Sequence, residues 1–253
     1  MPWIAAADNL ITTLSFWYQG LHDTDHPLSL LGDLADELFN DFRTLGILLL
    51  LGNNDSDLFL HNLMRSAQMR LSYLERMQVE GIEDDFYQAS GHYEPILAAI
   101  AAEDYDTVQG LYRLSAKELR PGEYEDDRCH AQILFRLAAS CPPPAADYQP
   151  FIDEYLEILD GEVCVRLDLV RAFIAREQQS FDVALASLLN EFGDNEVSED
   201  DLPGVRANHA ICIEALAMLR LASKHGLTTA AEYPYCPTLA RATLRNPLPE
   251  LPK

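Results

Sequence analysis

The chain has 253 residues, of which 48% are hydrophobic, and this supplies enough apolar side chain for a buried core. It has 41 acidic residues against 18 lysines and arginines, which gives a formal net charge of −23. A surface of that sign repels nucleic acid and anionic bilayers and attracts cationic proteins. The alternative is that the acidity only keeps the protein in solution.

The cysteine pattern and the chain start indicate a cytoplasmic protein. The five cysteines are odd in number, widely spaced and never in a C-x-x-C pair, so we expect reduced thiols and no disulfide framework. The opening MPWIAAADNLITTL lacks the basic segment of a signal peptide. The apolar run 45–52 is far shorter than the roughly 20 residues of a membrane span.

The composition predicts an all-α protein, because glycine is sparse while leucine, alanine, glutamate and arginine are plentiful. Apolar residues recur at helical spacing over 2–19, 28–51 and 55–80. Asp55 or Ser56 is expected to cap the third of these helices. The outer face of that helix is predicted to carry three arginines that pair with carboxylates of neighbouring helices: Arg65, Arg70 and Arg76.

Two segments are predicted to form antiparallel helical hairpins. Residues 163–192 contain one apolar stripe, the polar break 178–180 and a second stripe from Phe181, which indicates two packed helices joined by a short link. Residues 96–119 repeat this plan around the acidic break 103–104. The two hairpins are similar in plan, without a countable repeat period.

The remaining pattern completes a single helical bundle. Helices are expected at 124–140, at 147–159 with Asp147 as its N-cap, and at 205–225. The prolines after Cys141 are interpreted as an elbow near 141–147, and the proline-rich tail 231–253 is expected to lie extended over the bundle. We therefore predict one domain over 1–253, made of about ten helices and built from antiparallel hairpins.

Two segments are candidates for a catalytic or metal site. His22-Asp23-Thr24-Asp25-His26 has two imidazoles and two carboxylates, but it lies in a predicted loop with no general base on an adjoining helix. Glu154 and Glu157 match half of the Glu-x-x-Glu pattern of all-α magnesium phosphohydrolases, and no second half follows, so we expect one solvated helix face. No G-x-S-x-G, P-loop or G-x-G-x-x-G occurs. The sequence predicts a protein that is not an enzyme, with no catalytic residue, metal or cofactor; a metal-dependent hydrolase built on His22 and His26 stays a minor alternative.

Three acidic segments are the candidate partner-binding surface. They fall in predicted connections or at helix starts, so they can project from one end of a bundle and offer carboxylates to Arg and Lys of a partner. The alternative is three unrelated solvated loops. The candidate residues are Asp84, Asp85, Glu125, Asp126, Asp127, Asp194, Glu196, Glu199, Asp200 and Asp201.

Three stretches resemble the immunity protein 49 family, all-helical antidotes encoded beside bacterial polymorphic toxins: RLDLVRAFIAREQQSFDVALASLLNEF (166–192), HAICIEALAMLRLASKHGL (209–227) and YPYCP (233–237). The resemblance implies no enzyme activity, no cofactor, and a role in binding and neutralising a cognate toxin. It carries over no contact residue.

Together with the charge, the resemblance predicts an immunity protein whose acidic surface binds a cytoplasm-acting toxin, a basic nuclease or deaminase domain. We expect a monomer or a toxin–immunity heterodimer that binds neither nucleic acid nor membrane. The alternative is a TPR- or HEAT-like helical adaptor that holds a peptide or partner protein on the concave side of its paired hairpins.

Overall fold

The computed structural model describes residues 2–23, 25–82, 86–139, 144–195, 197–198 and 200–249. Within these residues the chain forms helices and no strand, so the all-α prediction is confirmed. The 3₁₀ turns are η1 (Leu28–Leu30), η2 (Phe86–Gln88) and η3 (Thr238–Arg241). The α-helices are α1 (Pro2–His22), α2 (Leu31–Asn53), α3 (Ser56–Glu80), α4 (Glu94–Ala101), α5 (Tyr105–Leu114), α6 (Glu125–Ala139), α7 (Ala145–Leu159), α8 (Val165–Ala175), α9 (Gln178–Gly193), α10 (Pro203–Asn208) and α11 (Ile213–Lys224).

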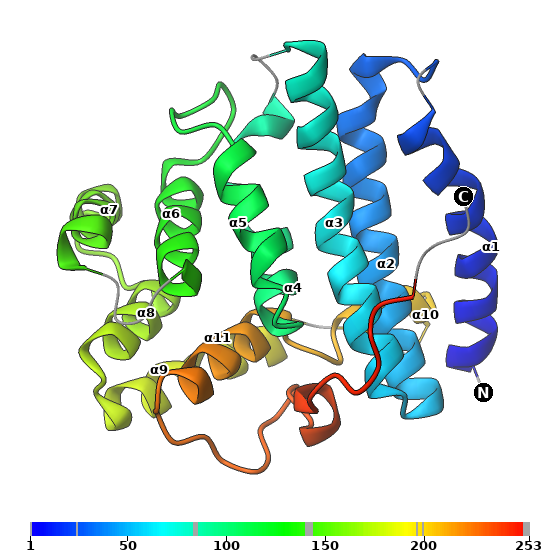
Figure 1. The fold of residues 1–253 in the computed structure, drawn as a ribbon. Helices are drawn as coiled ribbons and strands as arrows, with labels where there is room; N and C mark the ends of the chain where they lie inside the picture. Colours follow the sequence, from blue (N-terminus) through cyan, green and yellow to red (C-terminus); the bar gives the residue numbers. More distant parts are fainter. Residues whose placement is uncertain are drawn as a thin grey trace.

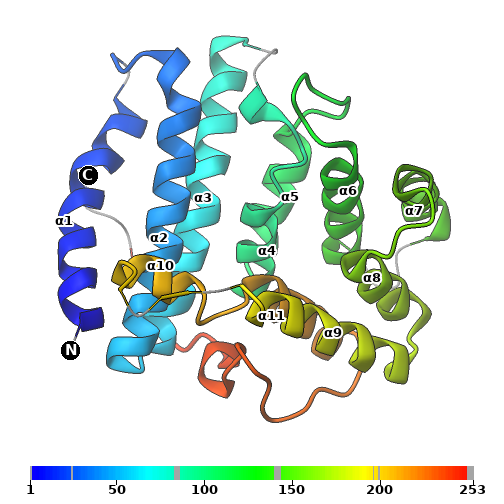
Figure 2. The ribbon, with the colours of Figure 1, turned by 180° about the vertical axis from the view of Figure 1, so that it is seen from behind.

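The helices form a row with a second group across its lower end. Figure 1 shows α1, α2 and α3 side by side and antiparallel, followed by α4 with α5, and then by α6 and α7. Helices α8, α9 and α11 cross the lower part of this row, and Figure 2 shows them from behind. Both predicted hairpins are present as α4–α5 and α8–α9, although α5 ends at Leu114 and not near residue 119.

Helix α4 is the most deeply buried helix of the bundle, and it packs against both α3 and α11. Every residue from Pro95 to Ala101 is buried, and only Glu94, in the first turn, is exposed. The apolar surface removed from water there stabilises the contact between the row and the lower helices. Glu94 is thereby fixed at the junction of the two groups.

The predicted N-caps agree with the structure at one helix and differ at another. Asp55 caps α3, because its Oδ1 accepts a hydrogen bond from the backbone N–H of Leu58 at 2.9 Å. Asp147 does not cap α7, which begins two residues earlier, directly after Pro144. Proline in front of a helix presets an extended backbone, so α7 begins without a side-chain cap.

The last predicted helix, 205–225, is broken in the structure. Residues 209–212 separate α10 from α11, and Cys212 has an extended backbone with φ −84° and ψ 96°. The Cys212 N–H donates to the carbonyl of Tyr235 at 2.9 Å. The tail therefore takes a hydrogen bond that a continuous helix would have used.

The arginines of α3 agree with the prediction in part, because Arg70 is attracted by the carboxylate of Asp36 on α2, and all three also donate to backbone carbonyls. Arg70 is buried, with 2% of its surface exposed, and donates to the carbonyl of Ala89 at 2.6 Å. Arg76 donates to the carbonyl of Asp23 at 2.7 Å. Arg65 donates to the carbonyl of Pro249 at 3.1 Å. These bonds satisfy backbone carbonyls of neighbouring loops, a role that helical spacing does not reveal.

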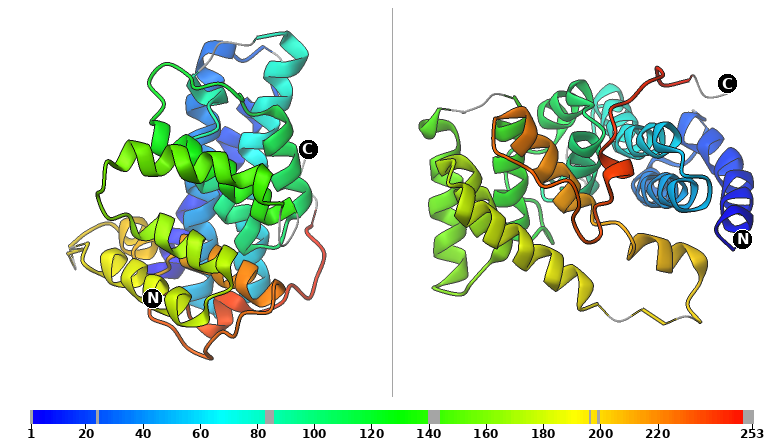
Figure 3. Two further views of the ribbon diagram at one scale, coloured as in Figure 1. Left: turned by 90° about the vertical axis from the view of Figure 1, so that its left-hand side faces the viewer. Right: turned by 90° about the horizontal axis from the view of Figure 1, so that it is seen from below.

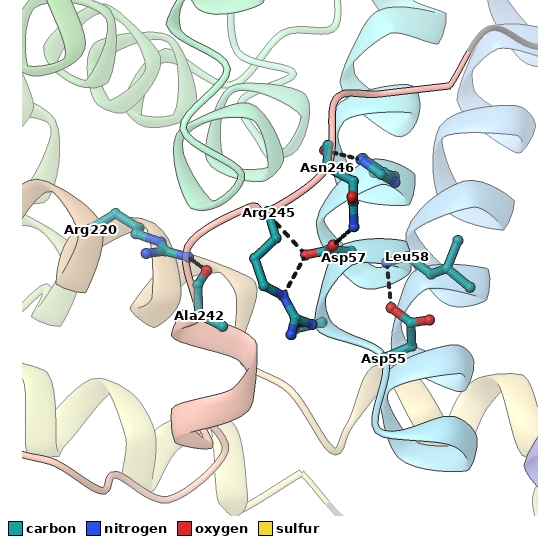
Figure 4. A network of polar contacts seen from close by, with 9 residues as sticks. Asp55, Asp57, Leu58, Arg220, Ala242, Arg245 and Asn246 are labelled. Atoms are coloured by element: carbon teal, nitrogen blue, oxygen red, sulfur yellow. Dashed lines mark hydrogen bonds and ion pairs between the residues drawn. The ribbon is translucent and has the colours of Figure 1, made fainter.

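The C-terminal segment crosses α11 and α3, as Figure 4 shows in close-up. Arg220 of α11 donates to the carbonyl of Ala242 at 2.6 Å. Further along, the backbone N–H of Arg245 donates to Asp57 Oδ1 at 3.2 Å, and the Asn246 amide donates to the same carboxylate. Asp57 lies in the first turn of α3. The tail is therefore hydrogen-bonded both to α11 and to the start of α3.

Candidate binding cavity

A cavity of about 690 Å³ lies where the row of helices meets the lower group. Its wall combines α2, the start of α4, the start of α8, the end of α9 and the segment 208–214. Small-molecule and side-chain binding sites in proteins commonly measure roughly 300–1,000 Å³. The cavity is therefore large enough to receive a ligand or a side chain of a partner.

Five charged side chains line this cavity, and they come from five different elements. The carboxylates are Glu94 of α4, Glu191 of α9 and Glu214 of α11. The cations are Arg43 of α2 and Arg166 of α8. Because these residues are far apart in the sequence, only the packing of the helices brings them together.

Arg166 and Glu214 form an ion pair in the wall of the cavity. The Arg166 Nε lies 3.1 Å from Oε1 and Oε2 of Glu214. The same guanidinium lies over the ring of Tyr93, 5.1 Å from the ring centroid. Burial raises the pKa of Glu214, and the attraction of Arg166 lowers it in part. The pair thus keeps the largely buried carboxylate of Glu214 close to a cation.

His130 of α6 lies behind Glu214. It is 2% exposed, and its Nε2 lies 3.6 Å from Glu214 Oε1. Burial, and then the positive charge of Arg166, lower the pKa of His130 to about 3. The imidazole is therefore neutral near neutral pH. Within the part of the chain that the structure describes, neither of its ring nitrogens has a hydrogen-bond partner.

Glu94 and Glu191 differ from Glu214, because their carboxylates are exposed and make no hydrogen bond or ion pair with the described residues. Glu94 lies in the first turn of α4, where the helix dipole favours a negative charge. Glu191 lies in the last turn of α9, which contains no basic residue. A carboxylate at that end of a helix gains no stabilisation from the dipole.

The structure places the predicted acidic residues on two sides of this cavity. Glu125, Asp126 and Asp127 form the first turn of α6, and Asp126 and Asp127 are half-buried. Asp194, Asp200 and Asp201 are exposed in the connection from α9 to α10. The predicted residues that lie outside the described ranges are Asp84, Asp85, Glu196 and Glu199.

The two described acidic segments do not lie at one end of the molecule. In Figure 2 α6 begins in the upper half, whereas the end of α9 and α10 lie in the lower half, above the C-terminal segment. Figure 3, seen from below, shows the connection leaving the end of α9 and reaching α10 on the outside of the bundle. Asn195 of that connection lines the cavity, and Asp127 is close enough to Arg166 for that cation to lower its pKa. The cavity is therefore the feature that lies between the two acidic segments.

Sequence reasoning missed the three carboxylates of the cavity. Glu191 carried a readable signal, since it falls at the end of a predicted helix that has no nearby cation. Glu94 and Glu214 carried none, because nothing local marks a glutamate that will face a cavity. Glu154, expected on a solvated face, instead forms an ion pair with Arg128.

The described residues offer no support for a metal site or a membrane-spanning helix. Among the described residues no group of three or more His, Cys, Asp or Glu is arranged to hold a metal ion. In the segment that contains His22 and His26, the carbonyls of Asp23 and His26 accept hydrogen bonds from Arg76. No helix in the described ranges is long and apolar enough to cross a membrane.

The fold and the cavity define an all-α protein with a charged recess at the junction of two groups of helices. A family model described as Immunity protein 49 matches residues 52–239, and the chain belongs to this family. The match confirms the family prediction and extends it from the C-terminal half to α3–α6. Neither the curated proteins nor the solved structures compared with the chain give a match.

Proposed function

We propose that this protein is an immunity protein that binds and neutralises a cognate secreted bacterial toxin acting in the cytoplasm. The observation that carries the proposal is the family match over residues 52–239. In this proposal the protein acts by binding alone, without catalysis or a cofactor. The complex is a toxin–immunity heterodimer, and the free protein is a monomer.

The charge of the chain supports a cationic toxin domain, such as a nuclease or a deaminase. A net charge of −23 favours encounter with a positively charged protein and disfavours nucleic acid. Exposed carboxylates flank the cavity at Glu125 and at Asp194, Asp200 and Asp201. Such groups act mainly on the association rate, by steering the partner towards its binding site. The acidic surface then covers the site at which the toxin would bind its own substrate.

Co-expression with the neighbouring toxin gene tests the proposal. We expect the chain to restore growth of cells that express the toxin and to be recovered with the toxin in a pull-down. Toxicity that is unchanged by co-expression, together with no recovered complex, would refute the antidote role. The helical adaptor would then be the better-supported hypothesis for the function of this protein.

A salt titration tests the electrostatic part separately. Raising the salt from about 50 mM to about 500 mM shortens the Debye length to roughly 4 Å, so the association rate is expected to fall at least about tenfold. A triple change of Asp194, Asp200 and Asp201 to Asn should slow association in the same direction. The matched control replaces three exposed carboxylates elsewhere: Asp8→Asn, Glu75→Gln and Glu157→Gln. If the association rate changes neither with salt nor in the loop variant, the acidic connection does not steer the toxin.

A further inference from the structure

We infer that the start of α3 is a binding site for an extended segment that contains an arginine. In the free protein the chain's own tail, residues 242–249, occupies this site, and in the complex a segment of the toxin displaces the tail. The inference rests on the proposed function, because the displacing partner is the cationic toxin. It gives the tail a regulatory role, since the tail and the toxin compete for one place on the protein.

The site on α3 is built around two polar side chains that are almost fully buried. Asp57 is 6% exposed and His61 is 3% exposed with the tail in place, and both line a cavity of about 860 Å³. Asp57 accepts hydrogen bonds from the backbone N–H of Arg245 at 3.2 Å and from the Asn246 amide, as Figure 4 shows. His61 Nε2 donates to the carbonyl of Asn246 at 2.9 Å. Hydrogen bonds to the main chain are a common way to bind an extended peptide.

The hydrogen-bonding capacity of this site is not exhausted by the tail. The second ring nitrogen of His61, Nδ1, is buried and has no hydrogen-bond partner within the described ranges. A buried polar atom without a partner costs free energy, so the tail fits the site incompletely. A different segment that reaches this nitrogen would be bound more favourably.

The charge of the tail matches the charge of the proposed toxin. The chain as a whole has a net charge of −23, yet residues 233–249 contain two arginines, Arg241 and Arg245, and no acidic residue. Among the described residues that line the cavity, the acids are Asp55 and Asp57, and the one Arg or Lys is Arg245 of the tail. The site without its tail is therefore acidic, and an arginine from a cationic partner supplies the same counter-charge.

The tail is held loosely enough to be displaced. None of the residues 241–249 is buried, so the tail removes little apolar surface from water. Arg245 Nε lies 3.5 Å from Asp57 Oδ1, and the Arg245 side chain is 71% exposed, so this ion pair contributes little free energy. Cys236 and Ala240 are buried, which fixes the chain just before the tail. The tail can therefore open about this point while the rest of the fold stays in place.

The family match separates the site from its occupant. Asp57 and His61 lie within the matched residues 52–239, whereas the tail 242–249 lies outside them. This division agrees with a site on the shared fold and a control segment added to it.

Binding measurements on the full-length chain with the toxin domain encoded beside it test the inference. The released-tail variant, Arg245→Ala with Asn246→Ala, weakens the hold of the tail and leaves α3 unchanged. A segment that fills a site lowers the apparent affinity for a competitor to the fraction of free sites, so this variant should bind the toxin about tenfold more tightly than the wild type. Hydrogen exchange over 242–249 verifies that the tail is released. Arg171→Ala, an exposed residue of α8, removes the same charge and is the matched control, expected to change the affinity less than about twofold.

Asp57→Asn distinguishes competition from a purely structural clamp. In the released-tail variant this change should weaken toxin binding about tenfold, because the toxin segment loses its charged acceptor. In the wild type it weakens the tail and the toxin alike, so its effect should be less than about threefold. Circular dichroism and thermal unfolding verify that each variant is folded.

The inference is overturned when the released-tail variant binds the toxin no more tightly than the wild type, or when Asp57→Asn has equal effects in both backgrounds. Either result would show that the tail is a fixed part of the fold. The proposed function survives both results as long as the wild type binds the toxin and rescues growth. It fails separately when the wild type does not bind the toxin.

Discussion

The titration of Asp127 leads to a prediction about toxin binding that the structure makes quantitative. Burial, and then the neighbouring charge of Asp126, raise the pKa of Asp127 from 3.8 to about 6, although Arg166 opposes the shift. Glu94 and Glu123 add to the same repulsion. A cationic toxin bound beside Asp127 favours the ionised carboxylate, so it must displace the proton wherever the free protein carries one.

The direction and the size of the pH effect on affinity follow from the difference between the pKa of Asp127 in the free protein and in the complex. Above about pH 7 the free carboxyl is already ionised, and binding has its full strength. Near pH 5 most free molecules carry the proton, and if the toxin returns the pKa to its ordinary value of 3.8, the affinity falls about tenfold, or by about 1.4 kcal/mol. Binding should therefore weaken as the pH falls through about 6.

Calorimetry at a series of pH values on the wild type and on Asp127→Asn measures this effect. The toxin has titrating groups of its own, so the informative quantity is the difference between the two pH curves. The Asn variant should bind more weakly than the wild type near pH 7.5 and should lose about tenfold of the pH dependence. Asp8→Asn, an exposed carboxylate on α1, is the matched control and should leave the curve unchanged.

Parallel curves for the wild type and Asp127→Asn would refute the reasoning, because the proton would then not be linked to binding. Tighter wild-type binding at low pH would refute it more strongly, since the carboxyl would have to bind the toxin in its neutral form. Parallel curves would place the toxin away from the start of α6, whereas tighter binding at low pH would place a hydrogen-bond acceptor of the toxin there.

Two further predictions concern the stability of the free protein. Burial raises the pKa of Asp36 to about 6 although Arg70 is close, so this carboxyl favours the folded state at low pH and loses that advantage as the pH rises from 3.8 to about 6. Asp36→Asn should therefore raise the free energy of unfolding in urea at neutral pH by up to about 3 kcal/mol and have little effect near pH 3.5, whereas equal effects at both would contradict the assignment. Asp57→Ala removes the acceptor for the Arg245 N–H and the Asn246 amide, and limited proteolysis should cut the tail faster than in the wild type. An unchanged cleavage rate would mean that other contacts hold the tail.

The elements that the sequence predicts well are those with local causes. The α8–α9 hairpin follows from two apolar stripes and the polar link between them, and Asp55 caps α3 through its own backbone neighbourhood. These features need no information about distant residues. For the same reason the sequence predicts helical structure correctly over most of the described residues.

The features that escaped prediction depend on contacts between distant segments. Helical periodicity continues through 209–212, yet the helix breaks there because Tyr235 accepts the Cys212 N–H. Arg70 has the helical spacing of a surface residue, but it is buried and donates a hydrogen bond to the carbonyl of Ala89. Hydrogen bonds of this kind override local propensity, and a single sequence does not reveal them.

The candidate site also combines features that the local sequence predicts with features that depend on tertiary packing. The acidity and exposure of Asp194, Asp200 and Asp201 could be read from a charged stretch between two helices. The cavity could not, because Glu94, Glu191 and Glu214 come from three helices whose relative packing decides whether they meet. Charge patterning thus leads to a hypothesis about the kind of partner, while the tertiary structure is needed to locate a cavity.

The strong negative charge and the cavity have one physical consequence in common. A net charge of −23 repels itself, and carboxylates such as Asp127 lie where burial and like charges raise the free energy of the ionised form. In the proposed complex a cationic toxin would relieve these terms on binding, and its affinity would be higher for that reason. The same unfavourable groups would reject an anionic or neutral protein, because its binding would desolvate them without supplying a counter-charge. Specificity for a cationic toxin would then arise from the arrangement of a few carboxylates around the cavity, and the total acidity would govern mainly how fast the two proteins meet.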